Sequence, residues 1–188
     1  QKICNKIIRE AKGKWEESII DIKKTISDEE RKTGIKSIEK PDPKTRISDV
    51  AWCNEQWVYD AIWPYMQQAN YDAGWRYIIE GAESAQITRY KKGGFYKLHR
   101  DGMGDYLSAH QRGHVRKLSM TVLLNDSYEG GEFEFAAYSK EQCVIATPEF
   151  HKVGSIVVFP SGVEHRICPV TKGTRYSLVV WFLGPPFV

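Results

Sequence analysis

The sequence predicts a mainly β protein, a sandwich or barrel with flanking N-terminal helices. Eight short β-rich runs follow residue 74, and Gly, Pro, Asn or Asp residues separate them at close spacing. This pattern is typical of all-β sandwiches and barrels. Before residue 74 the apolar residues instead recur at helical spacing, which favours helices on the N-terminal side. The 188 residues are enough for a single domain, residues 1–188, with a hydrophobic core.

The first 82 residues are expected to flank this β region. Residues 1–45 are predicted to be an irregular and helical segment, with a short helix over residues 2–12. Residues 46–82 are predicted to be a strand followed by a helix that Asn54 caps. The side chains expected to face the core are Ile3, Ile7 and Ile8 in the first helix and Trp57, Ala61, Ile62 and Tyr65 in the second.

The β-rich runs define the expected β core, residues 83–184, together with one run just before it. Each run combines β-branched or aromatic residues with a Gly, Pro, Asn or Asp boundary. The predicted strands lie in WRYIIEG (75–81), SAQITRYKKGGFYKLHRD (84–101), RKLSMTVLLND (116–126), GGEFEFAAY (130–138), QCVIAT (142–147), GSIVVFP (154–160), HRICPV (165–170) and TRYSLVVWFLG (174–184).

Composition narrows the class of protein. Residues 1–46 carry 13 basic and 9 acidic side chains and the remainder 14 and 15, which together give the totals of 27 and 24. The near-neutral β region argues against nucleic acid as a partner, because phosphate binding needs clustered Lys and Arg. No apolar run approaches the roughly 20 residues that span a bilayer, so no membrane association is expected. The four cysteines match no zinc pattern and predict reduced thiols and a cytoplasmic protein, although a Cys4–Cys53 disulfide stays open.

Two histidines and one aspartate are the candidate metal ligands. His99 and Asp101 are two residues apart, so on an extended chain their side chains point the same way. His165 begins a strand after a Pro-Ser-Gly turn, where a residue at a barrel mouth would lie. Two His and one carboxylate bind one face of Fe(II) and leave the opposite positions open. His110 and His114 are interpreted as residues of a mobile loop, and His151 as exposed.

Arg175 is predicted to point toward the same side as His165. If residues 171–173 form a three-residue hairpin loop with Gly173 in the left-handed conformation, Arg175 pairs with Pro169. His165 and Pro169 then share a face with Arg175, whereas a two-residue loop would place Arg175 on the opposite face.

An inward Arg175 suits the binding of a dicarboxylate. The planar guanidinium matches a carboxylate with two parallel hydrogen bonds, so it could hold the far end of a diacid whose other end chelates the metal. Ser177 could add a hydroxyl donor. A structural carboxylate is the alternative partner for Arg175.

In these residues the chain resembles the 2-oxoglutarate and Fe(II)-dependent dioxygenases, and within them the prolyl 4-hydroxylase group. His99-x-Asp101, His165 and Arg175 follow the spacing of the family, and RYKKGGFYKLHRD, SMTVLLNDSYEGGEFEF and FPSGVEHRICPVTKGTR follow its order. The resemblance covers about residues 83–183. Many collagen-type enzymes have Lys where this chain has Arg175, which leaves the subfamily open.

The resemblance implies a double-stranded β-helix, a jelly-roll and cupin-like barrel with the metal at its mouth. It implies His99, Asp101 and His165 as metal ligands and Arg175, Tyr90 and Ser177 as residues that bind 2-oxoglutarate. It also implies Tyr96 and Trp181 as residues that line the pocket, although both, like Tyr90, could be ordinary core aromatics. The implied cofactors are Fe(II), 2-oxoglutarate and O2, with ascorbate as a further candidate.

The expected reaction is hydroxylation of a C–H bond, with release of succinate and CO2. Peptidyl proline is the favoured substrate on resemblance, and a monomer the favoured state. A free amino acid, another small molecule or a nucleobase is the alternative substrate, and a jelly-roll binding module without activity is the alternative class. Residues 102–114 could form a lid over a peptide groove.

Overall fold

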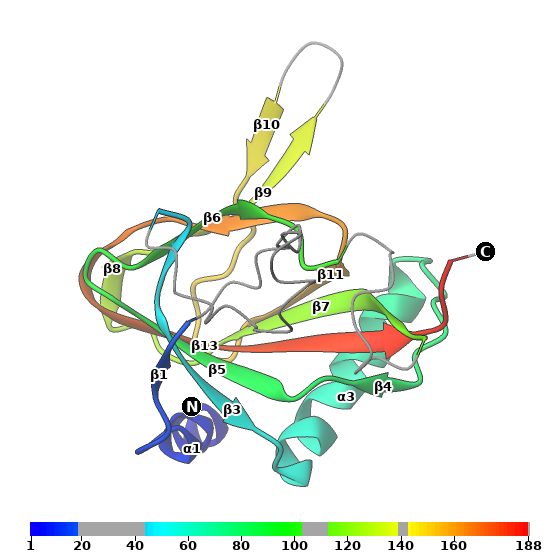
Figure 1. Ribbon diagram of the computed structural model, residues 1–188, viewed down its shortest axis with the longest axis horizontal. Helices are drawn as coiled ribbons and strands as arrows, with labels where there is room; N and C mark the ends of the chain where they lie inside the picture. The colour runs from blue at the N-terminus through cyan, green and yellow to red at the C-terminus, as the bar shows by residue number, and fades with distance from the viewer. Residues whose placement is uncertain (19–43, 103–112, 139–142, 188) are drawn as a thin grey trace, which may run out of the picture.

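Two β-sheets packed face to face form the body of the protein (Figure 1). The structure is a computed structural model, and it describes residues 1–18, 44–102, 113–138 and 143–187. Phe133 in one sheet contacts Phe159 in the other, with ring centroids 5.7 Å apart. The mainly β class expected from the sequence is therefore confirmed.

The larger sheet has eight strands among the described residues. Its order is β1-β3-β5-β13-β7-β11, and β4 and β8 pair with the two ends of β13. The strands are β1 (Glu16–Glu17), β3 (Asp49–Cys53), β4 (Gly81–Ala82), β5 (Ala85–Lys91), β7 (Val115–Leu123), β8 (Tyr128–Gly130), β11 (Ile156–Pro160) and β13 (Val170–Gly184).

The smaller sheet has five strands in the part of the chain that is described, in the order β10-β9-β12-β6-β2. Its outermost hairpin, β9 and β10, projects from the body of the molecule (Figure 1). The strands are β2 (Arg46–Ile47), β6 (Phe95–His99), β9 (Phe133–Tyr138), β10 (Cys143–Ala146) and β12 (Glu164–Ile167).

Alternation along β13 separates two cores. Leu178, Val180 and Phe182 point to one face of the larger sheet, where they pack with residues of the helices. Because successive side chains of a strand point to opposite faces, Arg175 and Ser177 point to the other face, toward the smaller sheet. The space between the two sheets therefore receives both polar side chains.

Among the described residues, two helices cover the outer face of the larger sheet (Figure 1): α1 (Lys2–Glu10) and α3 (Gln56–Asp72). The rows that they bury agree only in part with the expected ones: Ile7 and Ile62 are buried as expected, but other members differ. The first buries Cys4 and Ile7 and leaves Ile3 exposed. The second buries Val58, Ile62 and Met66 and leaves Tyr65 exposed, while Glu55 stands at the N-cap position expected for Asn54.

Compared with the expected orientation, α3 is rotated about its axis, and this rotation has a physical reason. Its apolar and aromatic residues occupy adjacent helix positions, so two overlapping rows are possible and the sequence alone does not choose between them. The compact row at i, i+4 and i+8 faces the sheet, and Trp63 reaches in from the side to contact Phe182 with ring centroids 5.5 Å apart.

Two strand expectations are wrong. In the run 75–81 only Gly81 belongs to a strand. Residues 75–80 instead form a connection beside the end of β13, where the amide of Glu80 donates to the carbonyl of Leu183. The predicted hairpin after His165 does not form either: β12 pairs with β9 and β6, whereas β13 pairs with β5 and β7.

The chain instead crosses between the two sheets at Cys168 and Pro169. Proline has no N–H to donate to a ladder, which fits a crossing at this point. Gly173 does adopt the expected left-handed conformation, with φ of 75°, but the reason is different. A side chain there would lie 2.6 Å from the carbonyl oxygen of Ser127, so the backbone of β8 requires glycine.

All four cysteines are free thiols, with Cys4 and Cys53 buried in the core. In the described ranges, no helix has the length and apolar character to cross a membrane.

Candidate functional site

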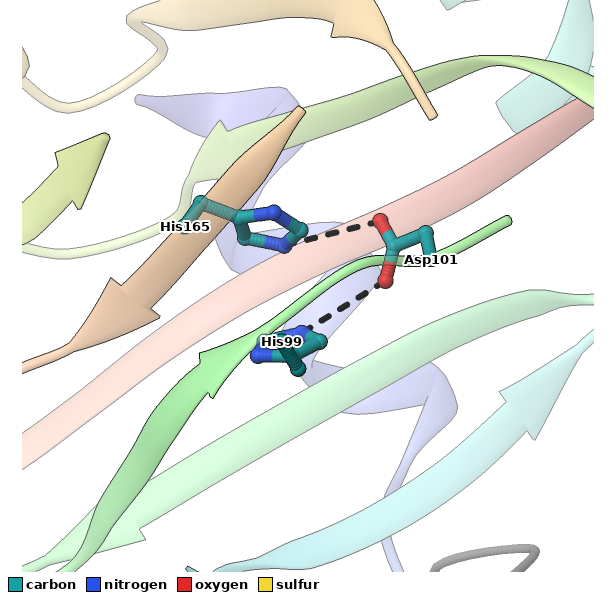
Figure 2. A group of neighbouring side chains, drawn as sticks. All are labelled: His99, Asp101 and His165. Carbon is teal, nitrogen blue, oxygen red and sulfur yellow. Dashed lines mark ion pairs between the residues drawn. The ribbon is translucent and has the colours of Figure 1, made fainter. Parts of the chain in front are cut away.

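His99 and His165 lie directly opposite one another between neighbouring strands (Figure 2). His99 is the last residue of β6, and its backbone partner on β12 is His165. The centroids of the two imidazole rings are 4.2 Å apart. The strand ladder therefore places both rings before any ligand is added.

Backbone carbonyls set the tautomer of both rings. The Nδ1 of His99 lies 2.8 Å from the carbonyl oxygen of Lys97, and the Nδ1 of His165 lies 3.0 Å from that of Val163. Because a carbonyl oxygen can only accept, each Nδ1 carries a proton, and each Nε2 is the ring nitrogen left to face Asp101 and to bind a metal. Burial lowers the pKa of His165, which keeps its ring neutral.

Asp101 completes the group from the bend after β6 (Figure 2). Its two carboxylate oxygens lie 3.5 Å from the Nε2 atoms of His99 and His165, respectively. Burial alone would raise the pKa of Asp101, but His165, His99 and the hydroxyl of Ser119 surround the carboxylate and hold its pKa below the usual value. The carboxylate is therefore charged.

These three side chains fit a divalent metal. Their ligand atoms all lie within 4.8 Å of one another, and no other group of this kind occurs among the described residues. Two ligands bonded at about 2.1 Å and at right angles are about 3 Å apart, close to the observed 3.5 Å spacing. Two imidazoles and one carboxylate are also the ligand set that suits Fe(II).

Arg175 is fully buried on β13 and is only partly paired. Its Nη1 donates to the Oγ of Ser177 at 3.1 Å, whereas Nε and Nη2 are buried without a partner. A buried guanidinium with two unpaired nitrogens is costly unless an anion meets it. The arrangement fits a carboxylate held by two parallel hydrogen bonds. Among the described residues, no structural carboxylate pairs with Arg175.

The surroundings hold Arg175 in place. Tyr90 is its backbone partner on β5, with the Tyr90 ring centroid 5.8 Å from the guanidinium carbon. Asn125 bonds the backbone on both sides of Arg175, donating to the carbonyl of Thr174 at 2.8 Å and accepting from the amide of Tyr176 at 2.7 Å. This role of Asn125 was not predicted from the sequence.

Phenylalanines connect the two parts of the site. Phe133 contacts His165 with ring centroids 5.5 Å apart and Phe150 with centroids 5.9 Å apart. Phe150 in turn lies 5.9 Å from the guanidinium carbon of Arg175. The histidines and the guanidinium are thus on two sides of one apolar cluster, in which charges interact more strongly than in water.

Tyr96 and Trp181, the expected pocket residues, are connected to the candidate ligands in different ways, Tyr96 directly and Trp181 through Arg116. The Tyr96 ring stacks on His99 with centroids 3.5 Å apart, and burial raises the pKa of Tyr96 to about 12. Trp181 is buried, and its Nε1 has no partner. Arg116 bridges Trp181 to Asp101: it lies 4.1 Å above the indole and donates to the Asp101 carbonyl at 2.9 Å.

Of the other histidines, His114 and His151 are described and neither belongs to this group. His114 pairs with Glu80, and His151 is exposed. His110 and most of the expected lid, residues 103–112, lie outside the described residues.

The sequence did not predict three residues that surround Asp101, namely Arg116, Ser119 and Ser161. Ser119 and Ser161 hydrogen-bond one another at 3.0 Å, and Arg116 reaches the Asp101 backbone. A buried Ser119 between apolar neighbours in LSMTVLL was the one signal in the sequence, because a buried hydroxyl needs a polar partner.

Comparison with solved structures supports the fold. The chain is similar to a prolyl-4-hydroxylase from Pseudomonas putida, with a TM-score of 0.57 and 19% identity over 95% of this chain and 97% of that one. It is also similar to a viral collagen prolyl hydroxylase from Paramecium Bursaria Chlorella virus-1, with a TM-score of 0.56 and 22% identity over 93% and 98% of the two chains.

Curated relatives match a part of their own length. A PKHD-type hydroxylase of Parvibaculum lavamentivorans is 36% identical over 97 residues, which is 50% of this chain and 39% of that protein. One from Teredinibacter turnerae is 32% identical over 94 residues, again 39% of its length. The chain thus spans about two fifths of these relatives.

The match to a family covers the strands that carry the site. A model of the 2OG-Fe(II) oxygenase superfamily matches residues 85–183, more than half of the chain. These residues include all three candidate ligands and Arg175, and their two sheets form the double-stranded β-helix that the resemblance implied. The chain therefore belongs to the 2OG-Fe(II) oxygenase superfamily, the expected family, whose enzymes use Fe(II), 2-oxoglutarate and O2.

Proposed function

We propose that this chain is a 2-oxoglutarate- and O2-dependent hydroxylase that uses Fe(II). One observation carries the proposal: the same barrel holds a buried His-Asp-His group and a buried guanidinium with two unpaired nitrogens. A metal alone would explain the first feature but not the second. A dicarboxylate cosubstrate that also chelates the metal explains both.

Each residue has a distinct role in this proposal. His99, Asp101 and His165 bind the metal, and their two neutral rings and one charge leave a net positive centre that attracts a keto acid. Arg175 binds the far carboxylate of 2-oxoglutarate, with Ser177 holding one guanidinium nitrogen and Tyr90 beside it. The phenylalanine cluster excludes water between these two ends.

The reaction balances without another reductant. One oxygen atom of O2 enters the C–H bond of the substrate to give an alcohol, and the other enters 2-oxoglutarate, which loses CO2 and becomes succinate. Fe(II), when bound, supplies the oxidising chemistry with O2. The protein holds the cosubstrate, fixes the ligands and places the substrate carbon next to the metal. Ascorbate does not enter this balance, so its use is a separate question.

Peptidyl proline is the proposed substrate. The names of the structural neighbours support this choice: several are prolyl hydroxylases, and one, from Trichoplax adhaerens, is described in complex with a peptide fragment of a hypoxia inducible factor. Tyr96, which stacks on His99, and Trp181, which Arg116 connects to Asp101, would form the walls of the pocket, since aromatic side chains suit contact with a proline ring.

The test measures two products at once. The protein is incubated with Fe(II), 2-oxoglutarate and a library of proline-containing peptides; succinate is quantified, and mass spectrometry follows the gain of one oxygen atom. Succinate with peptide oxidation supports the whole proposal. Succinate without peptide oxidation, but with oxidation of an amino acid, another small molecule or a nucleobase, keeps the chemistry and rejects the substrate. Metal binding with no succinate under any condition favours a binding module.

A further inference from the structure

The backbone around Asp101 is held from two sides. Asp101 lies two residues beyond His99, the last residue of β6, so the strand ladder does not fix it. The amides of Asp101 and Gly102 both donate to the carbonyl of Ser161, each at 3.0 Å. From the other side, the Nη1 of Arg116 donates to the carbonyl of Asp101 at 2.9 Å.

Arg116 is itself fixed by two further contacts. Its Nε and Nη2 form a two-pronged pair with the carboxylate of Glu83, both at 2.6 Å. Its guanidinium lies 4.1 Å above the Trp181 ring, and the amide of Glu83 bonds the Trp181 carbonyl at 2.9 Å. Packing against the Asp101 turn is tight, because a side chain at Gly102 would lie 3.1 Å from the Cβ of Arg116.

We propose that Arg116, locked by Glu83, is a positioning residue that sets the place of the Asp101 carboxylate. The inference rests on the proposed function, since it concerns the metal group. A carboxylate ligand in a bend needs an outside constraint, and the guanidinium supplies one that is already oriented when the metal arrives. Because Arg116 contacts both Asp101 and Trp181, a displacement of Trp181 would also move Asp101.

The chain offers a matched control for loss of an arginine–carboxylate pair. Arg89 pairs with Asp49 at 2.6 Å, with side chains 23% and 20% exposed, against 22% and 21% for Arg116 and Glu83. Arg89 also lies over a tryptophan, 4.2 Å from the centroid of Trp15. Its side chain contacts Asp49 and Trp15 rather than the three ligands, so Arg89 reports the cost of losing such a pair away from the metal group.

The experiment measures the affinity of the metal-free protein for Co²⁺, used as a redox-stable divalent probe, by calorimetric titration. Arg116→Met should weaken Co²⁺ binding about 10- to 100-fold, the usual range for an outer partner of a metal ligand. Arg89→Met should bind Co²⁺ as the wild type does, although both variants should have lower melting temperatures. Glu83→Gln, a milder change of the same pair, should weaken binding in the same direction and covers the case in which Arg116→Met does not fold.

Each outcome decides a separate question. The positioning role is rejected if Arg116→Met binds Co²⁺ like the wild type; where Arg116→Met does not fold, Glu83→Gln decides in the same way. It is also rejected if Arg89→Met loses as much Co²⁺ affinity as Arg116→Met. Failure of the proposed metal site looks different: the wild type and His165→Ala would then bind Co²⁺ equally.

Discussion

His99 and His165 are direct backbone partners across β6 and β12, with ring centroids 4.2 Å apart. Residues 66 positions apart in the chain are thereby brought together by a strand ladder rather than by a loop. Such a site is rigid before the metal binds, because ladder hydrogen bonds hold both backbones. Asp101 lies just outside the ladder and depends on Ser161 and Arg116 for its place.

Removal of any candidate ligand should abolish turnover. Two side chains do not fix a divalent ion as three do, so His99→Ala, Asp101→Ala and His165→Ala should each lose succinate formation and bind the metal much more weakly. Succinate release and Co²⁺ titration measure the two effects. His114→Ala and His110→Ala are the controls and should retain metal binding. Loss of the metal in His114→Ala with normal binding by His165→Ala would overturn the assignment.

Loss of the Arg175 guanidinium should weaken the binding of 2-oxoglutarate and should not change the affinity for the metal. Arg175→Met leaves a buried carboxylate of 2-oxoglutarate without a partner, which costs roughly 2–5 kcal/mol. At about 1.4 kcal/mol per tenfold change, the half-saturation for 2-oxoglutarate should rise about 30-fold or more. Arg175→Lys should lie between the two, because it keeps the charge but not the two-pronged geometry.

Arg175→Met should also affect the stability of the protein without cosubstrate. Since two guanidinium nitrogens of Arg175 are buried without a partner, Arg175→Met should leave the protein without cosubstrate at least as stable as the wild type. Thermal unfolding without 2-oxoglutarate checks this. An unchanged half-saturation in Arg175→Met, measured by succinate at saturating iron, would show that the residue does not bind cosubstrate.

Gly131→Ala should disturb cosubstrate binding through Arg175. Gly131 has φ of 68°, and a side chain there would lie 3.0 Å from the Cδ of Arg175 and 2.9 Å from a methyl group of Val170. Gly74→Ala is the control, because its φ is 70° but nothing lies within 4 Å. Both should lose roughly 1–2 kcal/mol of stability from the left-handed backbone. Only Gly131→Ala should raise the half-saturation for 2-oxoglutarate; equal effects of the two variants would refute the contact argument.

The ion pairs of Asp49 with Arg89 and Lys91 should contribute to the free energy of unfolding in a pH-dependent way. Burial raises the pKa of Asp49, but hydrogen bonds and charges from Arg89 and Lys91 outweigh it, so the folded pKa is lower than the unfolded one. The contribution is therefore complete above the unfolded pKa of about 3.9 and is lost as pH falls through the folded pKa.

Urea unfolding of the wild type and Asp49→Asn measures this share. The two should differ by about 1 kcal/mol or less at neutral pH, because the groups are partly solvated. The difference should shrink as the pH falls below about 4. A difference that stays constant across this range would mean that ionisation of Asp49 contributes nothing.

Local pattern was enough to predict most strands of the barrel. The strands β5, β6, β7, β9, β11 and β13 occur where β-rich runs meet turn residues, because alternation and turn chemistry are local properties. Helix rotation was not predictable, since two rows of apolar residues compete in α3. The division into residues 1–45, 46–82 and 83–184 stays a prediction.

The sequence by itself determined which residues could do the chemistry, and the tertiary structure decided how they meet. Spacing and residue type singled out His99, Asp101, His165 and Arg175, because few other sets combine neutral ligands, a carboxylate and a fixed cation. The reason given for an inward Arg175 was a hairpin that does not exist. Arg175 is inward because β13 lies in the opposite sheet from β12 and alternates its side chains across two cores. Strand pairing between distant segments depends on contacts that no local window contains, so Arg116, Ser119 and Asn125 emerged only from the folded chain.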